Sequence, residues 1–353
     1  MYTNYKYSMK EVLIWTRHET LVFFVIAIVA TCLYELVGLH WLHIPWALLA
    51  LIGTAVAFLI GFQNNAAYGR AWEARKVWGG IVNNSRTWAM VTRDFVTNEY
   101  ATSPATEERL ADERTRLIHR HLAWLTALRH AMRARKSWEV FADQRSGKEW
   151  YEKVCIPERD VTLSEDLTSL LDEDEHRRVL TKTNKAAAIL ALQSNHIRQL
   201  KDDGFLWSFS FLKLEDQLKE LFELQGKSER IKNFPYPRQY STVGHDLVRL
   251  FILLLPLGVI PEFAKIAQSL EASHPLTSDY FTWLAVPTIV IVAWVFHTMQ
   301  RIGITGENPF EGSANDVPIS TIARAIEIDL REMNDEPESQ IPDQLPTVHN
   351  VQM

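Results

Sequence analysis

Four apolar stretches interrupt an otherwise polar chain, at residues 20–39, 44–62, 250–260 and 280–300. A helix needs about 20 mainly apolar residues to cross the hydrocarbon core of a bilayer. The second stretch has no charged residue over such a length, whereas the third is short, contains Pro256 and is followed directly by Pro261. Proline inside a membrane helix usually bends it where neighbouring helices can satisfy the freed carbonyl group. The pattern therefore predicts four membrane-spanning helices, the third of them bent.

The second stretch arranges its side chains in two stripes. Residues four apart lie on one face of a helix, and the bulky stripe consists of Thr54, Phe58 and Phe62. Beside it runs a stripe of small residues, Gly53, Ala57 and Gly61. Small residues let membrane helices approach closely, so this helix suits a subunit that lines a space together with its neighbours. The alternative interpretation is that Phe58 and Phe62 face lipid or another helix.

A long charged region separates the second span from the third and carries helical patterns. Within 107–135, apolar residues recur three, four and seven positions apart while charged residues fill the other faces, which is typical of an amphipathic helix. An alternating aromatic run at 205–211 precedes a plainly helical segment, and we interpret it as the start of that helix. Since few strand signals occur anywhere, we expect an all-α fold. The proline-containing segment from residue 335 predicts a flexible tail.

Basic residues flank the spans unevenly. Lys6, Lys10 and Arg17 precede the first span, and several Lys and Arg residues follow the second, but the connection between these two spans has none. Between the third and fourth spans only Lys265 is basic. The positive-inside rule therefore places both termini and the central charged region in the cytoplasm. We expect a multi-pass protein of the cell membrane, which is the inner membrane if the source is Gram-negative.

Composition and motifs argue against several other classes of protein. The net charge of -6 argues against a nucleic-acid partner. Cys32 and Cys155 lie in very different contexts, so neither a disulfide nor a metal site is expected. His119 and His121 are two residues apart and share no helical face, and no His, Cys and carboxylate set has the spacing of a metal site. No phosphate-binding loop or nucleophile motif occurs. The sequence therefore predicts no enzyme and no cofactor.

Three motifs give the chain a resemblance to a known family. The segment 61–79, which reads Gly-Phe-Gln-Asn-Asn-Ala-Ala-Tyr-Gly-Arg-Ala-Trp-Glu-Ala-Arg and closes on Trp-Gly, resembles the end of the second span in the bestrophin family, especially in its bacterial branch. Segment 228–237 resembles the lead into that family's third span, and 307–330 resembles the belt after its last span. The resemblance covers nearly the whole chain up to about residue 335. Its motif residues are Asn64, Asn65, Tyr68, Arg70, Trp72, Glu73, Trp78, Glu229, Pro235, Asn308, Pro309, Phe310 and Asp316.

The resemblance implies a homopentameric ion channel. Each subunit would contribute four membrane helices and a large helical cytoplasmic domain, with the pore along the five-fold axis. Carried over to this chain, the hydrophobic neck of the pore falls on Thr54, Phe58 and Phe62, the stripe already found from helical spacing. The family's first neck position is usually a larger aliphatic residue, so Thr54 predicts a more polar outer end. A second, cytoplasmic constriction falls on Phe209, or on Trp207 if the register shifts by two.

The resemblance leaves the permeant ion open. The family at large implies small anions such as chloride, while its bacterial branch makes monovalent cations, sodium or potassium, the alternative. The neck has no ring of charged residues, and aromatic ring edges favour anions whereas ring faces favour cations. In eukaryotic members an acidic run after the Asn-Pro-Phe motif forms part of a calcium clasp. Here the run 311–316 retains two carboxylates, fewer than calcium coordination requires, so we expect no calcium gating.

Two further function classes compete with the channel. A membrane-anchored scaffold would use the spans only as an anchor and would carry no ions. A secondary transporter would need internal repeats or buried ionisable residues at the midplane, and the chain shows neither convincingly. The motif residues that follow the second span are expected to be structural, because Arg70 and Glu73 are three apart on a helix and can pair.

These expectations divide the chain into six segments. They are a cytoplasmic N-terminal segment 1–19, spans one and two with the neck 20–69, a cytoplasmic helical domain 70–244, spans three and four 245–300, a cytoplasmic belt and helix 301–334, and the flexible tail 335–353. The expected partners are further copies of the chain, small inorganic ions and the lipid bilayer.

Overall fold

The structure, a computed structural model, describes residues 1–271, 278 and 280–353. Within these residues nearly all regular structure is helical, and strand pairing is limited to two isolated β-bridges, Tyr2–Val351 and Val348–Val351. The predicted all-α class is therefore confirmed. The predicted segment 245–300 includes residues 272–277 and 279, which lie outside the described residues.

The chain folds into two compact units. The span unit comprises Asn4–Gly69 and Pro235–Glu307. The polar unit comprises Met1–Thr3, Arg70–Phe234 and Asn308–Met353. Helix α3 contributes residues to both units because it runs from Trp46 to Phe95.

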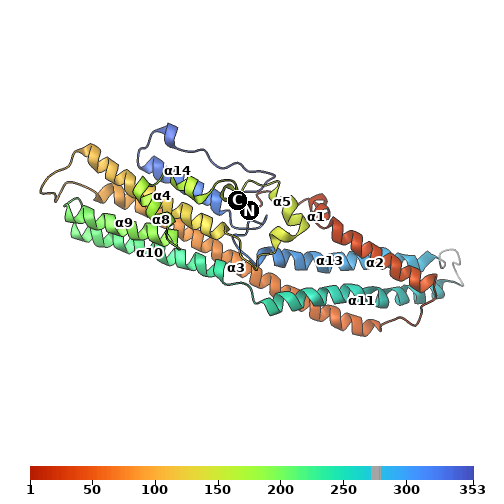
Figure 1. Ribbon diagram of the computed structural model, residues 1–353. Coiled ribbons are helices and arrows are strands. Elements are labelled where there is room, and N and C mark those ends of the chain that lie inside the picture. Colours follow the sequence, from red (N-terminus) through yellow and green to blue (C-terminus); the bar gives the residue numbers. More distant parts are fainter. Residues whose placement is uncertain (272–277, 279) are drawn as a thin grey trace. The chain divides into compact units, whose positions relative to one another are not determined.

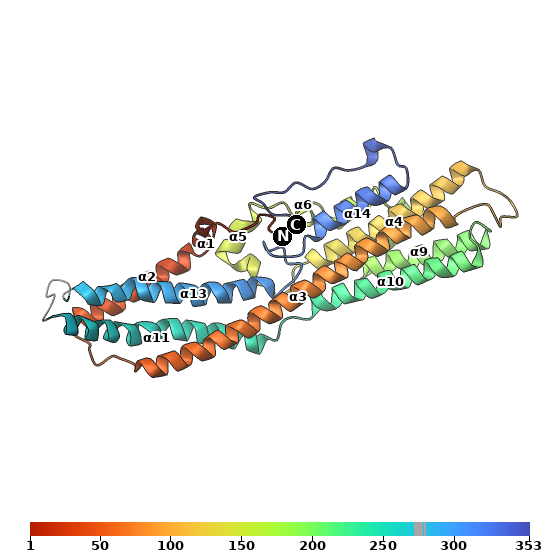
Figure 2. The same cartoon turned by 180° about the vertical axis from the view of Figure 1, so that it is seen from behind.

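The span unit is built mainly from long apolar helices, together with short helical segments. They are α1 (Met9–Trp15), α2 (Arg17–Glu35), the first half of α3 (Trp46–Phe95), α11 (Arg238–Leu270), η2 (Thr282–Leu284) and α13 (Ala285–Gly306). Helix α13 packs against both α2 and α11, and these helices lie side by side in both views (Figure 1 and Figure 2). The buried apolar side chains of this unit, among them Phe23, Val56, Ile60 and Phe251, form one core.

Four helical stretches of the described chain are long and apolar enough to cross a membrane, as predicted. They are Arg17–Glu35, Trp46–Phe95, Ser208–Leu270 and Thr282–Gly306. In the third, α11 continues through Pro256 and Pro261, both of which are buried. The fourth extends beyond the predicted 280–300 because Arg301 of α13 is buried and pairs with Glu19 of α2 at 3.1 Å. A paired arginine can remain inside the bundle at an acceptable cost.

The polar unit is a bundle of helices around a second apolar core. Its helices are the second half of α3, α4 (Glu107–Arg133), η1 (Phe141–Asp143), α5 (Arg145–Tyr151), α6 (Pro157–Asp160), α7 (Leu163–Leu167), α8 (Glu173–Leu180), α9 (Lys185–Asp202), α10 (Ser208–Asn233), α14 (Ile319–Met333) and η3 (Glu338–Gln340). Helix α4 packs against α9, α10 and α14 (Figure 2). The amphipathic helix predicted over 107–135 is α4, and Thr106 caps its first turn by accepting a hydrogen bond from the Arg109 backbone N–H.

Three fully buried tryptophans, Trp78, Trp88 and Trp124, belong to the core of the polar unit. The His121 ring lies 6.0 Å from the Trp88 ring and 5.2 Å from the Trp124 ring, between centroids. Burial lowers the pKa of His121 to about 3, so the imidazole is neutral at physiological pH. Its Nε2 lies 2.9 Å from the Ser85 hydroxyl oxygen. His121 is therefore a core residue whose polar group is satisfied.

Two predicted boundaries differ from the structure. The predicted cytoplasmic domain ends at 244, but the two units divide between Phe234 and Pro235, and α11 begins at Arg238. Pro235 and Pro237 cannot continue α10, and the chain starts a new helix after them. The predicted belt begins at 301, but α13 continues to Gly306.

The last segment of the chain is packed, which corrects the flexible tail predicted over 335–353. Val351 and Met353 are buried. The Thr321 hydroxyl of α14 donates to the Met353 carbonyl at 2.8 Å, and the Thr3 backbone N–H donates to the Asn350 carbonyl at 2.8 Å. The prolines and polar spacers suggested a loose tail, but the apolar side chains at its end gain free energy by burial against the polar unit.

Candidate functional site

The bulky stripe predicted on the second span is exposed on the span unit. Phe58 and Phe62 of α3 are 65% and 67% exposed, and their ring centroids lie 6.3 Å apart. The opposite face of the same helix buries Val56 and Ile60 in the apolar core. Within a single copy of the chain, this aromatic surface is therefore left uncovered.

Thr54 and the small-residue stripe belong to the same region of α3. Thr54 is exposed, and its hydroxyl donates to the Ala50 carbonyl at 2.8 Å. The hydroxyl proton is thus used within the helix, and only the lone pairs of the oxygen remain for other partners. A Cβ added to Gly53 would lie 3.0 Å from the Phe251 ring, so Gly53 lets α3 and α11 approach closely. The other two small residues of the stripe are exposed.

The first motif begins where α3 meets α13 in the span unit. The Asn64 side-chain amide donates to the Met299 carbonyl at 3.1 Å. A Cβ added to Gly303 would lie 2.4 Å from the Asn64 side-chain oxygen, so only glycine permits this approach of the two helices. Asn65 and Tyr68 are exposed on α3. The motif therefore fixes a helix contact through Asn64 and presents its next polar residues outward.

A buried carboxylate beside this motif was not predicted from the sequence. Glu307 is 2% exposed and accepts hydrogen bonds from the Gln63 side-chain amide at 2.6 Å and from the Ser241 hydroxyl at 3.1 Å. The three residues come from the end of the second span, the start of α11 and the residue after α13. The position of Glu307 directly before the Asn-Pro-Phe motif was the signal that could have identified it.

Arg70 and Glu73, the first charged motif residues of the polar unit, both find partners at the end of α10. The Arg70 guanidinium donates to the carbonyls of Ile231 and Phe234 at 3.1 and 2.8 Å. Glu73 accepts from Arg230 at 2.5 Å. The sequence indicated that Arg70 and Glu73, three residues apart on a helix, can pair with each other. The structure turns both toward α10. Arg70 binds there because the last carbonyls of a helix have no partner within it and attract cationic donors, whereas Glu73 pairs with the Arg230 side chain.

The remaining motif residues near α10 have structural contacts. Trp78 is fully buried and packs against Phe310, with 6.2 Å between ring centroids. Glu229 accepts from the Asn184 side-chain amide at 2.9 Å. Trp72 is 52% exposed on α3. Trp78 therefore joins the first motif to the third within the polar unit.

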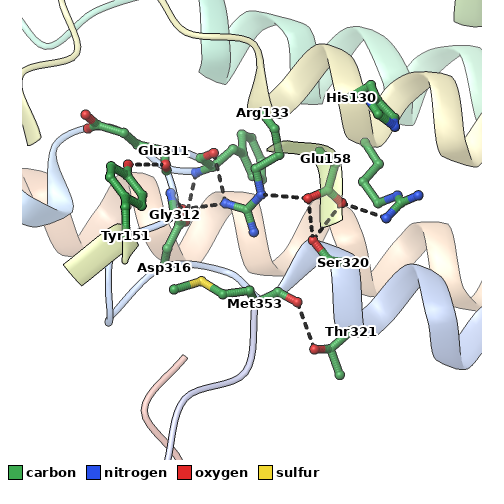
Figure 3. A network of polar contacts seen from close by, with 12 residues as sticks. His130, Arg133, Tyr151, Glu158, Glu311, Gly312, Asp316, Ser320, Thr321 and Met353 are labelled. Carbon is green, nitrogen blue, oxygen red and sulfur yellow. Dashed lines mark hydrogen bonds and ion pairs between the residues drawn. The ribbon is translucent and has the colours of Figure 1, made fainter. Parts of the chain in front are cut away.

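The third motif forms a loop that closes around a single carboxylate (Figure 3). Asp316 accepts hydrogen bonds from the backbone N–H groups of Phe310, Gly312 and Val317 at 2.8, 2.7 and 2.7 Å. Arg133 of α4 donates to Asp316 at 3.2 Å and to the Phe310 carbonyl at 3.0 Å. Phe310 has a φ of 77°, which is unusual for a residue with a side chain. These hydrogen bonds hold the loop in that conformation.

A second buried carboxylate extends this network (Figure 3). Glu158 pairs with Arg129 at 2.7 Å, lies 3.8 Å from Arg133, and accepts from the Ser320 hydroxyl at 2.7 Å. The neighbouring motif residues Asn308 and Pro309 are buried as well. No sequence pattern pointed to Arg133 or Glu158, because the segments that carry them lie about 25 residues apart and far from the motif in the chain.

Glu311 lies beside the loop in an unfavourable environment for a negative charge. Burial, reinforced by the nearby Glu139 carboxylate, raises the pKa of Glu311 to about 7. The Phe141 backbone N–H, which donates to Glu311 at 2.9 Å, acts in the opposite direction. Glu139 forms a buried ion pair with Lys232, and the Tyr151 hydroxyl donates to the Glu311 carbonyl at 2.7 Å. Glu311 therefore changes charge near neutral pH.

The aromatic run that was predicted to start α10 is divided in the structure. Helix α10 begins at Ser208, so Phe205 and Trp207 precede it. Phe205 is buried, whereas Trp207 and Phe209 are 46% and 66% exposed. They border a hollow of about 400 Å³ together with Tyr100 and residues from the end of α3. Phe209 and Trp207 are in ring contact with each other, so both remain candidates for the cytoplasmic constriction.

The described residues contain no cluster of three or more His, Cys, Asp or Glu side chains that could hold a metal ion. Cys32 and Cys155 are both free. In the loop after Phe310, the Asp316 carboxylate already has a cationic partner in Arg133. This arrangement opposes the binding of a divalent cation at that loop.

Comparisons with known proteins agree over nearly the whole chain. The family model described as Bacterial/Fungal Bestrophin protein matches residues 8–271 and 275–332. A voltage-dependent anion channel-forming protein of Ralstonia nicotianae is 28% identical over 305 residues, which cover 85% of this chain and 82% of the relative. A protein of the same description from Salmonella typhi is 26% identical over 313 residues, or 88% and 84% of the two chains. The crystal structure of a bacterial bestrophin homologue from Klebsiella pneumoniae has the same fold, with a TM-score of 0.70 at 23% identity and coverage of 90% of this chain and 98% of that chain.

Proposed function

The chain belongs to the bacterial and fungal bestrophin family, and on this basis we propose that it is a membrane channel for small anions such as chloride. The relatives named as voltage-dependent anion channel-forming proteins support an anion as the permeant ion. The four helices that are long and apolar enough to cross a membrane support a membrane location. The uneven distribution of basic residues supports a cell-membrane protein with both termini and the polar unit in the cytoplasm.

The observation that carries the proposal is the uncovered stripe on α3. One side of α3 exposes Phe58, Phe62 and Thr54, while the opposite side is buried in the apolar core. The exposed side is suited to face the same helix of other copies. Five copies around an axis would form a narrow aromatic neck, which resists ion entry unless it is wetted. The chain then acts as a homopentamer, and the neck lies along its five-fold axis.

The start of α10 supplies an electrostatic reason for anion passage at the cytoplasmic constriction. Phe209 is the second residue of this 26-residue helix. The N-terminus of a helix carries a partial positive charge because its first N–H groups have no partner within the helix. Phe209 of each subunit would thus present an apolar ring beside a weakly positive helix end. This arrangement favours small anions over the monovalent cations that the bacterial branch made an alternative.

The test is ion flux from purified protein in liposomes. Vesicles loaded with chloride should lose it through the protein once a potassium ionophore provides charge balance. Vesicles that have a sodium gradient and contain no permeant anion should keep the sodium gradient. Dissipation of the sodium gradient with chloride retained would favour the cation channel instead. Absence of both fluxes from assembled protein would favour the membrane-anchored scaffold.

A further inference from the structure

Three aromatic side chains of the polar unit form a continuous contact beside the start of α10. The Tyr100 and Trp207 rings are stacked, with centroids 5.8 Å apart and an interplanar angle of 15°. The Trp207 and Phe209 rings are tilted, with centroids 4.6 Å apart. We call Tyr100, Trp207 and Phe209 the aromatic stack. Stacked and tilted aromatic pairs of this kind add stability beyond the area they bury.

The backbone under the aromatic stack is closely fitted. Gly204 has a φ of +82°, and a Cβ added there would lie 2.7 Å from the Tyr100 carbonyl oxygen. The Thr97 backbone N–H donates to the Phe205 carbonyl at 3.0 Å. Only glycine fits at position 204 for two reasons, the left-handed conformation and the approach of the 97–101 segment. The turn before α10 and the segment after α3 are therefore held together.

Side chains reinforce both sides of this junction. The Asn98 side-chain amide donates to the Ala105 carbonyl at 2.8 Å, and its oxygen accepts from the Ala105 backbone N–H at 2.9 Å. The Arg109 guanidinium lies over the Phe205 ring, 5.3 Å from its centroid. The backbone segments that carry Tyr100 and Trp207 are thus held in place. Their rings are about half exposed, at 47% and 46%, and Phe209 at the other end of the stack is 66% exposed.

We propose that Tyr100 and Trp207 are positioning residues that hold the Phe209 ring and thereby set how the cytoplasmic constriction discriminates between anions of different size. This inference rests on the proposed function, in which Phe209 forms that constriction. An exposed phenylalanine can change rotamer with little hindrance, and a ring that moves does not define a fixed aperture. Contact with Trp207, itself backed by Tyr100, restricts the ring.

The first test reads the Phe209 ring directly and needs no ion flux. Phe209→4-fluorophenylalanine, introduced at this single position, gives one fluorine resonance that senses the ring current of Trp207. Trp207→Ala should move and broaden this resonance, Tyr100→Ala should move it less, and Tyr100→Phe should leave it in place. Phe222→Ala is the matched control, because Phe222 is an exposed phenylalanine about 20 Å further along α10. An unchanged resonance in Trp207→Ala would overturn the inference.

The second test measures the iodide-to-chloride permeability ratio from reversal potentials of the assembled protein. Phe209→Ala should change the ratio. Trp207→Ala should move it in the same direction by roughly threefold, in line with the strength of one aromatic pair. Trp207→Phe should restore most of the wild-type ratio, because it keeps a ring in the stack. A purely structural role of Trp207 would lower the amount of assembled protein without changing this ratio.

The outcomes separate the inference from the proposed function. If Phe209→Ala changes the permeability ratio but Trp207→Ala and Tyr100→Ala do not, the constriction stands and the positioning role is wrong. If Phe209→Ala leaves the permeability ratio of the conducting protein unchanged, Phe209 does not form the constriction, and the inference fails as well. If wild-type protein carries no ions, the proposed channel fails, and the fluorine resonance alone decides whether the stack holds the ring.

Discussion

At the scale of single residues, Asp316 shows how the loop after the last span is stabilised. Three backbone N–H groups and the Arg133 guanidinium donate to its two oxygens. A calcium ion would have to displace these donors and approach a site that contains an arginine. The retained carboxylate is therefore used to close the loop, and the thinned acidic run around it offers few other charged ligands.

We therefore predict that ion flux is insensitive to micromolar calcium. Flux is measured first with a chelator and then with micromolar free calcium, and the two rates should agree. Isothermal titration calorimetry of the wild-type protein with calcium is the control, since it detects binding without any flux. A steep and saturable rise in flux that Asp316→Ala abolishes would contradict this prediction.

Glu311 predicts a pH dependence of stability. Its pKa is about 7 in the folded chain, against an ordinary value of 4.5. Between pH 4.5 and about pH 7, the Glu311 carboxyl group is therefore mainly protonated in the folded state and mainly ionised in the unfolded state. The free energy of unfolding should fall as pH rises from about 4.5 to about 7, by at most roughly 3 kcal/mol, and level off above.

Glu311→Gln should remove this dependence, because the amide does not ionise. Thermal unfolding of the detergent-solubilised protein at pH 5, 6, 7 and 8 measures the effect. The Tm of the variant should rise relative to the Tm of the wild type as the pH rises. Glu152→Gln replaces an exposed carboxylate and should leave the wild-type profile unchanged. Parallel profiles of wild type and Glu311→Gln would show that Glu311 ionises normally.

Sequence spacing identified the residues that repeat on one helix but not those that meet across the fold. Thr54, Phe58 and Phe62 follow from a four-residue period, and the structure leaves them exposed as one stripe. Arg133 and Tyr100 belong to no such repeat in the sequence. Each gains its role from a partner more than 100 residues away in the chain, and a single sequence does not encode such pairings in a local pattern.

At the scale of elements, the exposed stripe of α3 can face either a pore or lipid, and a double variant separates these two arrangements. If Phe58 and Phe62 form the neck, replacing both by Ala should widen and wet it, and unitary conductance should rise several-fold. Single-channel recording in planar bilayers gives the measurement. Phe24→Ala is the matched control, because Phe24 is an exposed phenylalanine on α2. Equal conductance of the assembled double variant and wild type would indicate that the stripe faces lipid.

The contact of α3 with α13 predicts an intolerant glycine. Gly303→Ala would place a Cβ 2.4 Å from the Asn64 oxygen, whose side chain is held by its hydrogen bond to Met299. We expect a loss of about 1–3 kcal/mol in stability, as for other overpacked sites, seen as a lower Tm in detergent. Gly226→Ala is the control, because nothing lies within 4 Å of a Cβ at that position of α10. Its Tm should be unchanged or higher, since alanine favours a helix.

The long apolar and amphipathic helices followed from the pattern of apolar residues, whereas their ends and the short helices did not. The amphipathic α4 and the four apolar helices were predicted from periodicity and length. The end of α13 was missed because Arg301 is neutralised by a distant partner, Glu19. The packed tail was missed because its two buried residues, Val351 and Met353, follow a proline-rich stretch that dominated the composition.

At the scale of the whole molecule, the exposed Trp72 of α3 predicts a role in assembly. A half-exposed tryptophan is costly in water and is typical of an interface. We expect Trp72→Ala to lower the fraction of the proposed pentamer, measured by mass photometry in detergent, before it changes the ratio of anion to cation flux. Lys76→Ala alters an exposed residue one turn further along the helix and should assemble normally. A fully assembled Trp72→Ala with reversed ion preference would contradict this assignment.

The fluorescence of the buried tryptophans reports whether the polar unit is folded. Trp78, Trp88 and Trp124 are shielded from water, whereas Trp41 and Trp46 of the span unit are 74% and 51% exposed. Shielded indoles emit at shorter wavelength and resist collisional quenchers such as acrylamide. Loss of the polar unit's packing would therefore appear as a red-shifted emission and a new quenchable fraction. In a denaturant titration, this signal would separate melting of the helical bundle from disruption of the apolar helices, which helical circular dichroism alone would report as one quantity.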